Sequence, residues 1–172
     1  WFEINAPNDF DLYGYDWEKI VIRKPRLLKI FNKLKIEKRF FNLSLKTYKG
    51  EISDKRNILE KYKFSFSLEN AININGYITE KIFDCFVSGT IPIYLGSNSI
   101  YNFVPKDCFI DMKDFNSVNE IYEFIKCLKD DKYIYMQNNI SDFLESSVSK
   151  QFTDEGYVQN ILPKILELLH ND

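Results

Sequence analysis

Glycine, proline and long apolar runs are all scarce in this sequence. Only 6 glycines and 5 prolines occur among 172 residues, which argues against long linkers and disordered tails. No apolar run approaches the roughly 18 to 20 residues that span a bilayer. The N-terminus does not resemble a signal peptide and begins at Trp1-Phe2 without a methionine, so we expect that an upstream segment is missing.

Metal-ligating residue types are also few. The single histidine, His170, lies near the C-terminus, and the three cysteines are widely spaced at Cys85, Cys108 and Cys127. This distribution argues against a metal site built from His and Cys. Because Cys85 lies within an apolar helical pattern and Cys127 lies beside one, we predict buried free thiols rather than a redox centre.

The sequence does contain many aromatic residues and an uneven distribution of charge. The formal net charge of −2 conceals a segment from Lys19 to Lys49 that has eleven Lys or Arg residues against one acid, Glu37. This basic segment is interpreted as the solvated surface of a helix pair. The alternatives are a surface for an anionic membrane or for a phosphorylated ligand. Nucleic acid is less favoured, because no groove-reading motif accompanies the charge.

Short strands alternate with helices along the chain. Alternating apolar and polar residues predict a strand over 63–68, and apolar residues at helical spacing predict a helix over 79–89 that ends at Gly89. Ser53 or Asp54 is expected to begin an earlier helix, and Ser117 with Glu120 forms a capping box. Further strands are predicted over 10–13, 90–96 and 107–112, and a last amphipathic helix over 157–169. The alternation predicts one α/β domain over 1–172, doubly wound, with a mostly parallel sheet.

The segment from Glu69 to Thr79 is the place where such a fold would bind a ligand, beyond the carboxyl end of a strand. The first turn of the helix that follows offers unpaired N–H groups and a partial positive charge, which suit a phosphate. Lys81 adds a full positive charge at the same end of the helix. Because cations are favoured at helix C-termini, an anionic ligand is the better explanation for a lysine at this position. Glu80 offers acceptors for sugar or ribose hydroxyls, and Tyr77 offers a ring face and a hydroxyl.

A simpler interpretation of the same residues stays open. Glu80 is favoured in the first turn of any helix, and Lys81 can be a solvent-exposed side chain. A turn of small residues, Gly96-Ser97, follows the next strand at the same sheet edge and adds weak support for a ligand site.

Three stretches together resemble a known family. "YKFSFSLEN" (62–70), "GYITEKIFDCFVSGTIPIYLGS" (76–97) and "FVPKDCFIDMKDF" (103–115) are similar, in order and spacing, to the donor-binding half of the alpha-1,3-fucosyltransferase family, glycosyltransferase family ten. "DLYG" (11–14) and "YKG" (48–50) resemble weaker upstream elements of that family. The resemblance implies a two-domain GT-B glycosyltransferase. This chain would be its Rossmann-like C-terminal half, and the N-terminal acceptor domain would be absent.

The resemblance also implies a reaction and a set of site residues. The enzyme would transfer fucose from GDP-fucose to a hydroxyl of an N-acetylglucosamine-containing glycan with inversion. By matching position, Lys81 would contact the pyrophosphate and Glu80 the hydroxyls, and these two would act catalytically by stabilising charge on the donor side. The full donor-binding set is Glu69, Asn70, Tyr77, Thr79, Glu80, Lys81, Lys49, Gly96 and Ser97.

Two parts of the family pattern are not found securely. The family uses a basic residue, usually Arg, upstream of the first stretch to contact the phosphates; Lys46, Lys49 and Arg56 are the candidates, of which Lys49 is preferred. No residue of this chain is assigned as the general base. We therefore expect the chain alone to bind donor weakly and to transfer nothing. "DFD" (9–11) is read as a loop rather than a metal motif, so no metal is predicted, although a divalent ion could assist.

Two alternative functions remain at this point. One is a GT-B transferase that uses another nucleotide sugar, because sequence patterns rarely identify the sugar. The other is a non-catalytic α/β module that binds an anionic membrane surface or a partner through residues 19–49. The expected location is cytoplasmic or peripheral to the inner membrane in a bacterium, and the Golgi lumen in a eukaryote.

Overall fold

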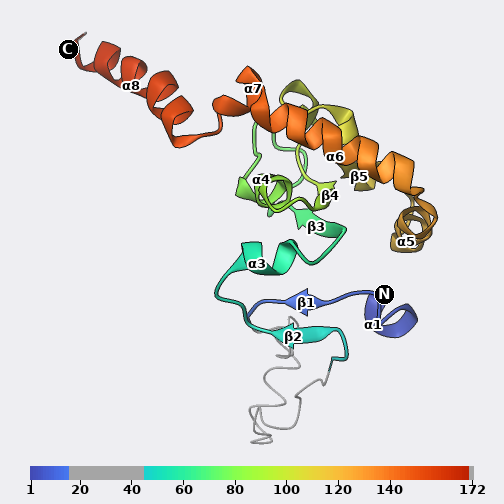
Figure 1. Cartoon of the computed structure of the whole chain (residues 1–172). Coiled ribbons are helices and arrows are strands. Elements are labelled where there is room, and N and C mark those ends of the chain that lie inside the picture. Colours follow the sequence, from blue (N-terminus) through green and yellow to red (C-terminus); the bar gives the residue numbers. More distant parts are fainter. Residues whose placement is uncertain (16–44, 171–172) are drawn as a thin grey trace, which may run out of the picture. The chain divides into compact units, whose positions relative to one another are not determined.

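The computed structural model describes residues 1–15 and 45–170 (Figure 1). These residues belong to two compact units, Trp1–Ser53 and Asp54–Asp172. The prediction of one nucleotide-sugar-binding domain over 1–172 remains a prediction. Most of the basic segment, residues 19–44, lies outside the described residues.

The first unit is held together by a small parallel sheet and by hydrogen bonds to a partly exposed carboxylate. It contains α1 (Phe2–Asn5), β1 (Leu12–Tyr13) and β2 (Tyr48–Gly50), and β1 pairs with β2 in parallel. The Glu3 carboxylate accepts hydrogen bonds from the Lys46 N–H (2.7 Å), the Thr47 N–H (3.0 Å) and the Thr47 hydroxyl (2.8 Å). These bonds lower the pKa of Glu3 and join α1 to the chain just before β2.

The second unit is built on a three-stranded parallel sheet. Its strands are β3 (Phe64–Leu68), β4 (Ile91–Leu95) and β5 (Ile110–Asp111), in the order β3-β4-β5. Phe64 is in register with Ile91, and Ile93 with Ile110. The α/β class with parallel sheets is therefore confirmed.

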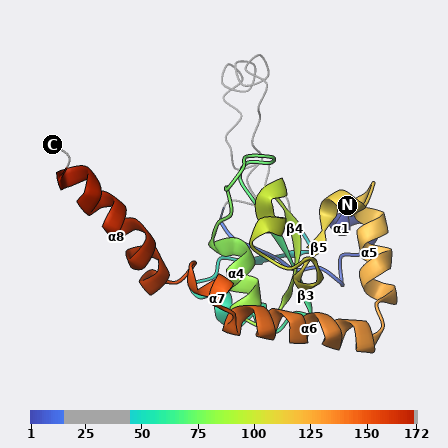
Figure 2. The same cartoon turned by 90° about the horizontal axis from the view of Figure 1, so that it is seen from above.

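Helices and 3-10 turns connect and cover these strands. α4 (Glu80–Val87) crosses from β3 to β4, and Figure 2 shows α4 and α5 (Val118–Cys127) on opposite sides of the sheet. α6 (Asp130–Glu145) runs across the same unit. The remaining elements are α3 (Lys55–Leu59), η2 (Asn98–Asn102), η3 (Lys106–Cys108), η4 (Met112–Asp114), α7 (Ser147–Lys150) and α8 (Asp154–His170).

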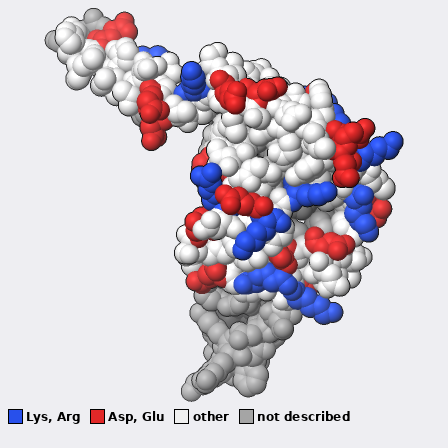
Figure 3. Space-filling model, in the orientation of Figure 1, with Lys and Arg blue, Asp and Glu red and all other residues white. Residues whose placement is uncertain are grey.

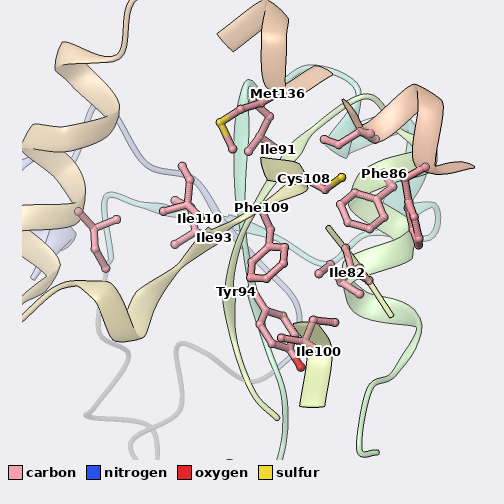
Figure 4. Packing of buried hydrophobic residues seen from close by; sticks show 14 residues of the cluster. Ile82, Phe86, Ile91, Ile93, Tyr94, Ile100, Cys108, Phe109, Ile110 and Met136 are labelled. Atoms are coloured by element: carbon pink, nitrogen blue, oxygen red, sulfur yellow. The ribbon is translucent and has the colours of Figure 1, made fainter. Parts of the chain in front are cut away.

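The core of the second unit lies on both faces of β4. Residues 91–94 are all buried, and because successive strand residues point to opposite faces, both faces must be covered. Figure 4 shows Tyr94 near Phe109 and Ile82. The rings of Tyr94 and Phe109 meet edge to face, with their centroids 5.7 Å apart. Met136 of α6 lies near Ile91 in the same view.

Local capping signals match the structure closely. Asp54 caps α3 by accepting from the Arg56 and Asn57 N–H groups, and Ser117 caps α5 by accepting from the Glu120 N–H (3.2 Å). The Glu120 carboxylate accepts from the N–H of Asn116 (2.9 Å), one residue before the cap, so this arm of the predicted capping box is displaced.

Two predictions of burial are wrong. In β3 the expected alternation fails at its end, where Ser67 is 2% exposed and Leu68 is 45% exposed. Cys85 and Cys108 are buried as predicted, but Cys127 is exposed because it lies at the last position of α5, beyond the helix face that packs. The amphipathic helix predicted over 157–169 is confirmed as α8, and its apolar stripe, including Val158 and Leu162, is exposed, since the helix leads away from the sheet (Figure 1). Within the described residues, no helix combines the length and the apolar character needed to cross a membrane.

Candidate functional site

The carboxyl ends of β3, β4 and β5 bring three separate stretches of the motif to one edge of the sheet. Glu69 and Asn70 follow β3, Gly96 and Ser97 follow β4, and Lys113 follows β5. The strands are parallel and adjacent, so their carboxyl ends meet at this edge. The structure therefore brings together the predicted donor-binding residues of the second unit, and the remaining one, Lys49, belongs to the first unit.

Glu69 is the most deeply buried ionisable group at this edge, with a side chain that is 0% exposed. Its Oε1 accepts from the Thr79 N–H (2.8 Å), and its Oε2 accepts from the Thr79 hydroxyl (2.7 Å). Both carboxylate oxygens are thus used to attach the beginning of α4 to the end of β3. Thr79 in turn makes no capping bond to α4, so its hydroxyl does not satisfy the first-turn N–H groups.

Lys81 lies beside this carboxylate. Its Nζ donates to Asn70 Oδ1 (2.9 Å) and is 3.7 Å from Glu69 Oε2, while its side chain is 26% exposed. In the sequence analysis, an anionic ligand is the favoured explanation for a lysine in the first turn. The structure supplies an internal anion instead, because Glu69 lies close enough to offset the unfavourable helix dipole. Lys81 is nevertheless partly open to solvent, and it is oriented by Asn70 and Glu69.

Glu80 and Tyr77 differ from their neighbours because the polar atoms of their side chains have no partner among the described residues. Glu80 is exposed, and within residues 1–15 and 45–170 its carboxylate has no hydrogen-bond or ion-pair partner. The hydroxyl of the half-buried Tyr77 likewise has no partner among those residues. Both groups are thus available to a ligand at the beginning of α4.

Gly96 and Ser97 lie against the buried side of the same edge. A Cβ on Gly96 would lie 2.6 Å from Glu69 Cγ and would collide with the Tyr94 hydroxyl, so only glycine fits between them. The Tyr94 hydroxyl accepts from the Ser97 N–H (3.1 Å), and burial raises the pKa of Tyr94. The Ser97 hydroxyl accepts from the Ser99 N–H (3.2 Å). Both residues serve the local packing.

These observations separate the predicted residues into two named sets. Residues whose polar atoms are used inside the protein, or that fit only by close packing, are called the frame residues: Glu69, Thr79, Gly96 and Ser97. The other four residues are at least partly open to solvent and are called the open residues: Asn70 and Lys81, which bond to each other (2.9 Å), and Tyr77 and Glu80, whose side chains have no polar partner among the described residues.

The upstream basic candidates are divided between the two units. Lys49 belongs to the first unit, where its Nζ is 3.3 Å from Asp11 and donates to the Lys46 carbonyl (3.2 Å). Arg56 is paired with Glu60 at 3.2 Å on α3. The role of Lys49 in phosphate binding stays a prediction.

The sequence analysis missed Lys113 and the pair formed by Tyr101 and Asp111. Lys113 Nζ donates to Gly96 O (2.8 Å), Asn98 Oδ1 (2.5 Å) and Asn73 Oδ1 (3.1 Å). The Tyr101 hydroxyl donates to Asp111, and burial together with this carboxylate raises the pKa of Tyr101. The stretch "FIDMKDF" contains Lys113 and Asp111, but neither residue follows from periodicity.

Charge on the described surface is mixed. Figure 3 shows Lys and Arg side chains interspersed with Asp and Glu on the visible face. Ion pairs of the second unit include Lys106–Asp114 and Lys132–Asp107. In the part of the chain that is described, no group of three or more His, Cys, Asp or Glu residues could hold a metal ion.

Comparison with known proteins gives a family match over most of the chain. The model described as glycosyltransferase family 10 (fucosyltransferase) C-term matches residues 21–139. The alpha-(1,3)-fucosyltransferase FucT of Helicobacter pylori is 34% identical over 123 residues, which cover 70% of this chain and 25% of the relative. The human 4-galactosyl-N-acetylglucosaminide 3-alpha-L-fucosyltransferase 9 is 33% identical over 92 residues, which cover 51% of this chain and 25% of the relative.

A solved structure shows a similar match. A crystal structure of an alpha1,3-fucosyltransferase with GDP-fucose is 25% identical with a TM-score of 0.49, covering 76% of this chain and 39% of that one. This chain spans about a quarter of the length of the curated relatives it matches.

Proposed function

Because this chain belongs to glycosyltransferase family 10, the fucosyltransferases, we propose that it binds the donor in an enzyme that transfers fucose from GDP-fucose to a glycan. The acceptor group would be a hydroxyl of an N-acetylglucosamine-containing glycan, and the sugar carbon would be inverted. The chain would form the Rossmann-like half of a GT-B enzyme, and the acceptor domain would lie elsewhere in the protein. The single observation that carries the proposal is the partly exposed Lys81 ammonium, oriented by Asn70 at the start of α4.

The chemistry of transfer explains why a cation belongs at this position. The acceptor oxygen forms a bond to C1 of fucose while the bond from C1 to the phosphate oxygen breaks, and the electron pair leaves with GDP. Negative charge therefore grows on the diphosphate as the transition state forms. Lys81 and the first-turn N–H groups of α4 would stabilise that charge where it develops. The proton of the acceptor hydroxyl passes to a base that is not assigned in this chain.

The neighbouring groups would orient Lys81 and bind the rest of the donor. Glu69 is 3.7 Å from Lys81, but both of its oxygens bind Thr79, so it orients the ammonium without forming a close ion pair. Glu80 has a free carboxylate that would accept from two hydroxyls of the ribose or of fucose. Tyr77 would contribute its ring face and its hydroxyl. The proposal needs no metal ion, since Lys81 and backbone N–H groups would meet the charge, although a divalent ion could assist.

Ligand-induced stabilisation of the full-length protein tests the proposal. GDP-fucose, GDP-mannose and UDP-sugars are compared by thermal shift at equal concentrations. A ligand present at about 100 times its Kd stabilises by about 2.7 kcal/mol, which is several degrees in Tm. Stabilisation by GDP-fucose above the other nucleotides is the expected result. A larger shift with another sugar nucleotide would identify a different donor, and no shift with any of them would favour a non-catalytic module.

A further inference from the structure

Residues 71–76, part of the segment between β3 and α4, have almost no apolar anchorage. Residues 72–76 are all exposed, and their two large apolar side chains, Ile72 and Ile74, are 50% and 52% exposed. Burial of apolar surface therefore contributes little to their position. Yet this segment leads directly into Tyr77 and the beginning of α4, where the open residues lie.

Polar contacts to the turn after β4 hold the segment in place. Asn73 has a positive φ of 63° and donates its N–H to Gly96 O (3.4 Å), and the Gly76 N–H donates to the Ser99 hydroxyl (2.8 Å). Lys113 adds a side-chain link between the two sides. Its ammonium donates to Asn73 on the segment and to Gly96 and Asn98 on the turn.

Lys113 is itself fixed by β5 and η4. The Asp111 carboxylate accepts from the Lys113 N–H (2.9 Å) and caps η4, while Asp111 also receives the Tyr101 hydroxyl. The three acceptors on the Lys113 ammonium are neutral oxygens, and within the described ranges no carboxylate pairs with it. A charged donor shared by three neutral acceptors makes stronger hydrogen bonds than neutral donors do.

We propose that Lys113 is a positioning residue that holds residues 71–76 in the conformation that places Tyr77 for the donor. The inference rests on the proposed function of this edge as a GDP-fucose site. Without the ammonium, the segment would populate other conformations, and the donor would have to select the competent one. The apparent Kd rises in inverse proportion to the competent fraction, so a tenfold loss of that fraction weakens binding about tenfold. Turnover of the bound enzyme changes little, because the bound donor restores the conformation.

Lys113→Ala in the full-length protein tests this positioning role, with Lys106→Ala as a matched control. Lys106 lies on η3 and carries the same charge, and among the described residues its ammonium makes only a surface pair with Asp114 at 3.6 Å. Lys113→Ala is expected to raise the KM for GDP-fucose about tenfold with kcat within about twofold of the wild type. Lys113→Arg is expected to recover part of the affinity, and Asn73→Gly, which keeps the positive φ but removes one acceptor, to raise KM about threefold.

Hydrogen exchange in the ligand-free protein separates this inference from the proposed function. The amides of Asn73 and Gly76 are expected to exchange at least tenfold faster in Lys113→Ala, while α4 keeps its protection. Unchanged exchange at these amides would overturn the positioning role, whatever the donor is. A lowered Tm with KM within twofold of the wild type would also overturn it and leave a purely structural residue. Exchange can also rise in Lys113→Ala while the wild type does not bind GDP-fucose. In that case the proposed function fails, and so does the role of Lys113 toward that donor. Only the contact of Lys113 with residues 71–76 is then established.

Discussion

The frame residues and the open residues lie within one motif, yet they differ in what their polar atoms do. Glu69 and Ser97 are buried and bonded within the protein, whereas Asn70 and Glu80 are exposed at the same sheet edge. A sequence motif by itself does not separate these roles. The structure indicates that part of the motif maintains the shape of the sheet edge and that another part is exposed, where a ligand can contact it.

This comparison leads to a simple expectation for substitutions. Changes in the frame residues should lower the free energy of unfolding, and they should weaken donor binding only as far as the edge deforms. Changes in the open residues should leave stability almost unchanged and alter KM or kcat. Four substitutions test this division, and three of them have a control elsewhere in the chain.

Lys81→Ala is expected to have the largest effect. Loss of the ammonium removes stabilisation of the leaving diphosphate, and kcat should fall at least about a hundredfold, which corresponds to about 2.7 kcal/mol. Steady-state kinetics with GDP-fucose measure the change, and thermal unfolding should show a shift of no more than a few degrees. Lys55→Ala is the control, because Lys55 is an exposed lysine whose Nζ pairs with Asp84 at 3.2 Å. Wild-type turnover in Lys81→Ala would exclude the phosphate role.

Gly96→Ala is expected to destabilise the fold by about 1–3 kcal/mol, the usual cost of overpacking. The added Cβ would lie 2.6 Å from Glu69 Cγ and would collide with the Tyr94 hydroxyl. Displacement of Glu69 should also weaken donor binding. Gly89→Ala is the control, because its φ of +69° strains any side chain while no neighbouring atom lies within 4 Å. Chemical denaturation and donor titration are measured for both, and equal donor affinity in the two variants would contradict a link from Gly96 to the site.

Glu80→Ala is expected to raise the KM for GDP-fucose about three- to tenfold without changing the unfolding midpoint. The free carboxylate makes no bond within the described residues, so stability should not depend on it, and the loss reflects one or two hydrogen bonds to donor hydroxyls. Glu123→Ala, an exposed glutamate on α5, is the matched control. A wild-type KM in Glu80→Ala would show that Glu80 does not bind the donor and is only a residue type favoured in the first turn of a helix.

The sequence predicted well those features that depend on local chemistry. Asp54 and Ser117 cap their helices through side-chain oxygens, which need only a few residues of context. The order of strands and helices predicted parallel pairing, because crossovers of this length permit little else. The same sequence placed the ligand edge between Glu69 and Thr79, although the assignment of its residues to a donor is still a prediction.

Features that depend on a distant partner were not predictable from the sequence. Helical spacing groups Val158 and Leu162 on one face of α8, but it cannot tell whether another element covers that face. The offset of the Lys81 charge by Glu69 depends on how the end of β3 meets the beginning of α4. Lys113 reaches Asn73 and Gly96 only because β5 lies beside β4, a fact of topology rather than of spacing.

Ser97→Ala gives the smallest expected effect and the sharpest test of the division. Its hydroxyl accepts from the Ser99 N–H and bonds the Ser99 hydroxyl (2.7 Å), so its loss should cost about 0.5–1 kcal/mol of stability, as for a lost cap. Because the hydroxyl is used internally, the KM for GDP-fucose should stay within about twofold of the wild type. A KM increase of tenfold or more without a change in stability would place Ser97 among the open residues. A frame residue can affect donor binding only by deforming the sheet edge, and unfolding measurements detect such a deformation.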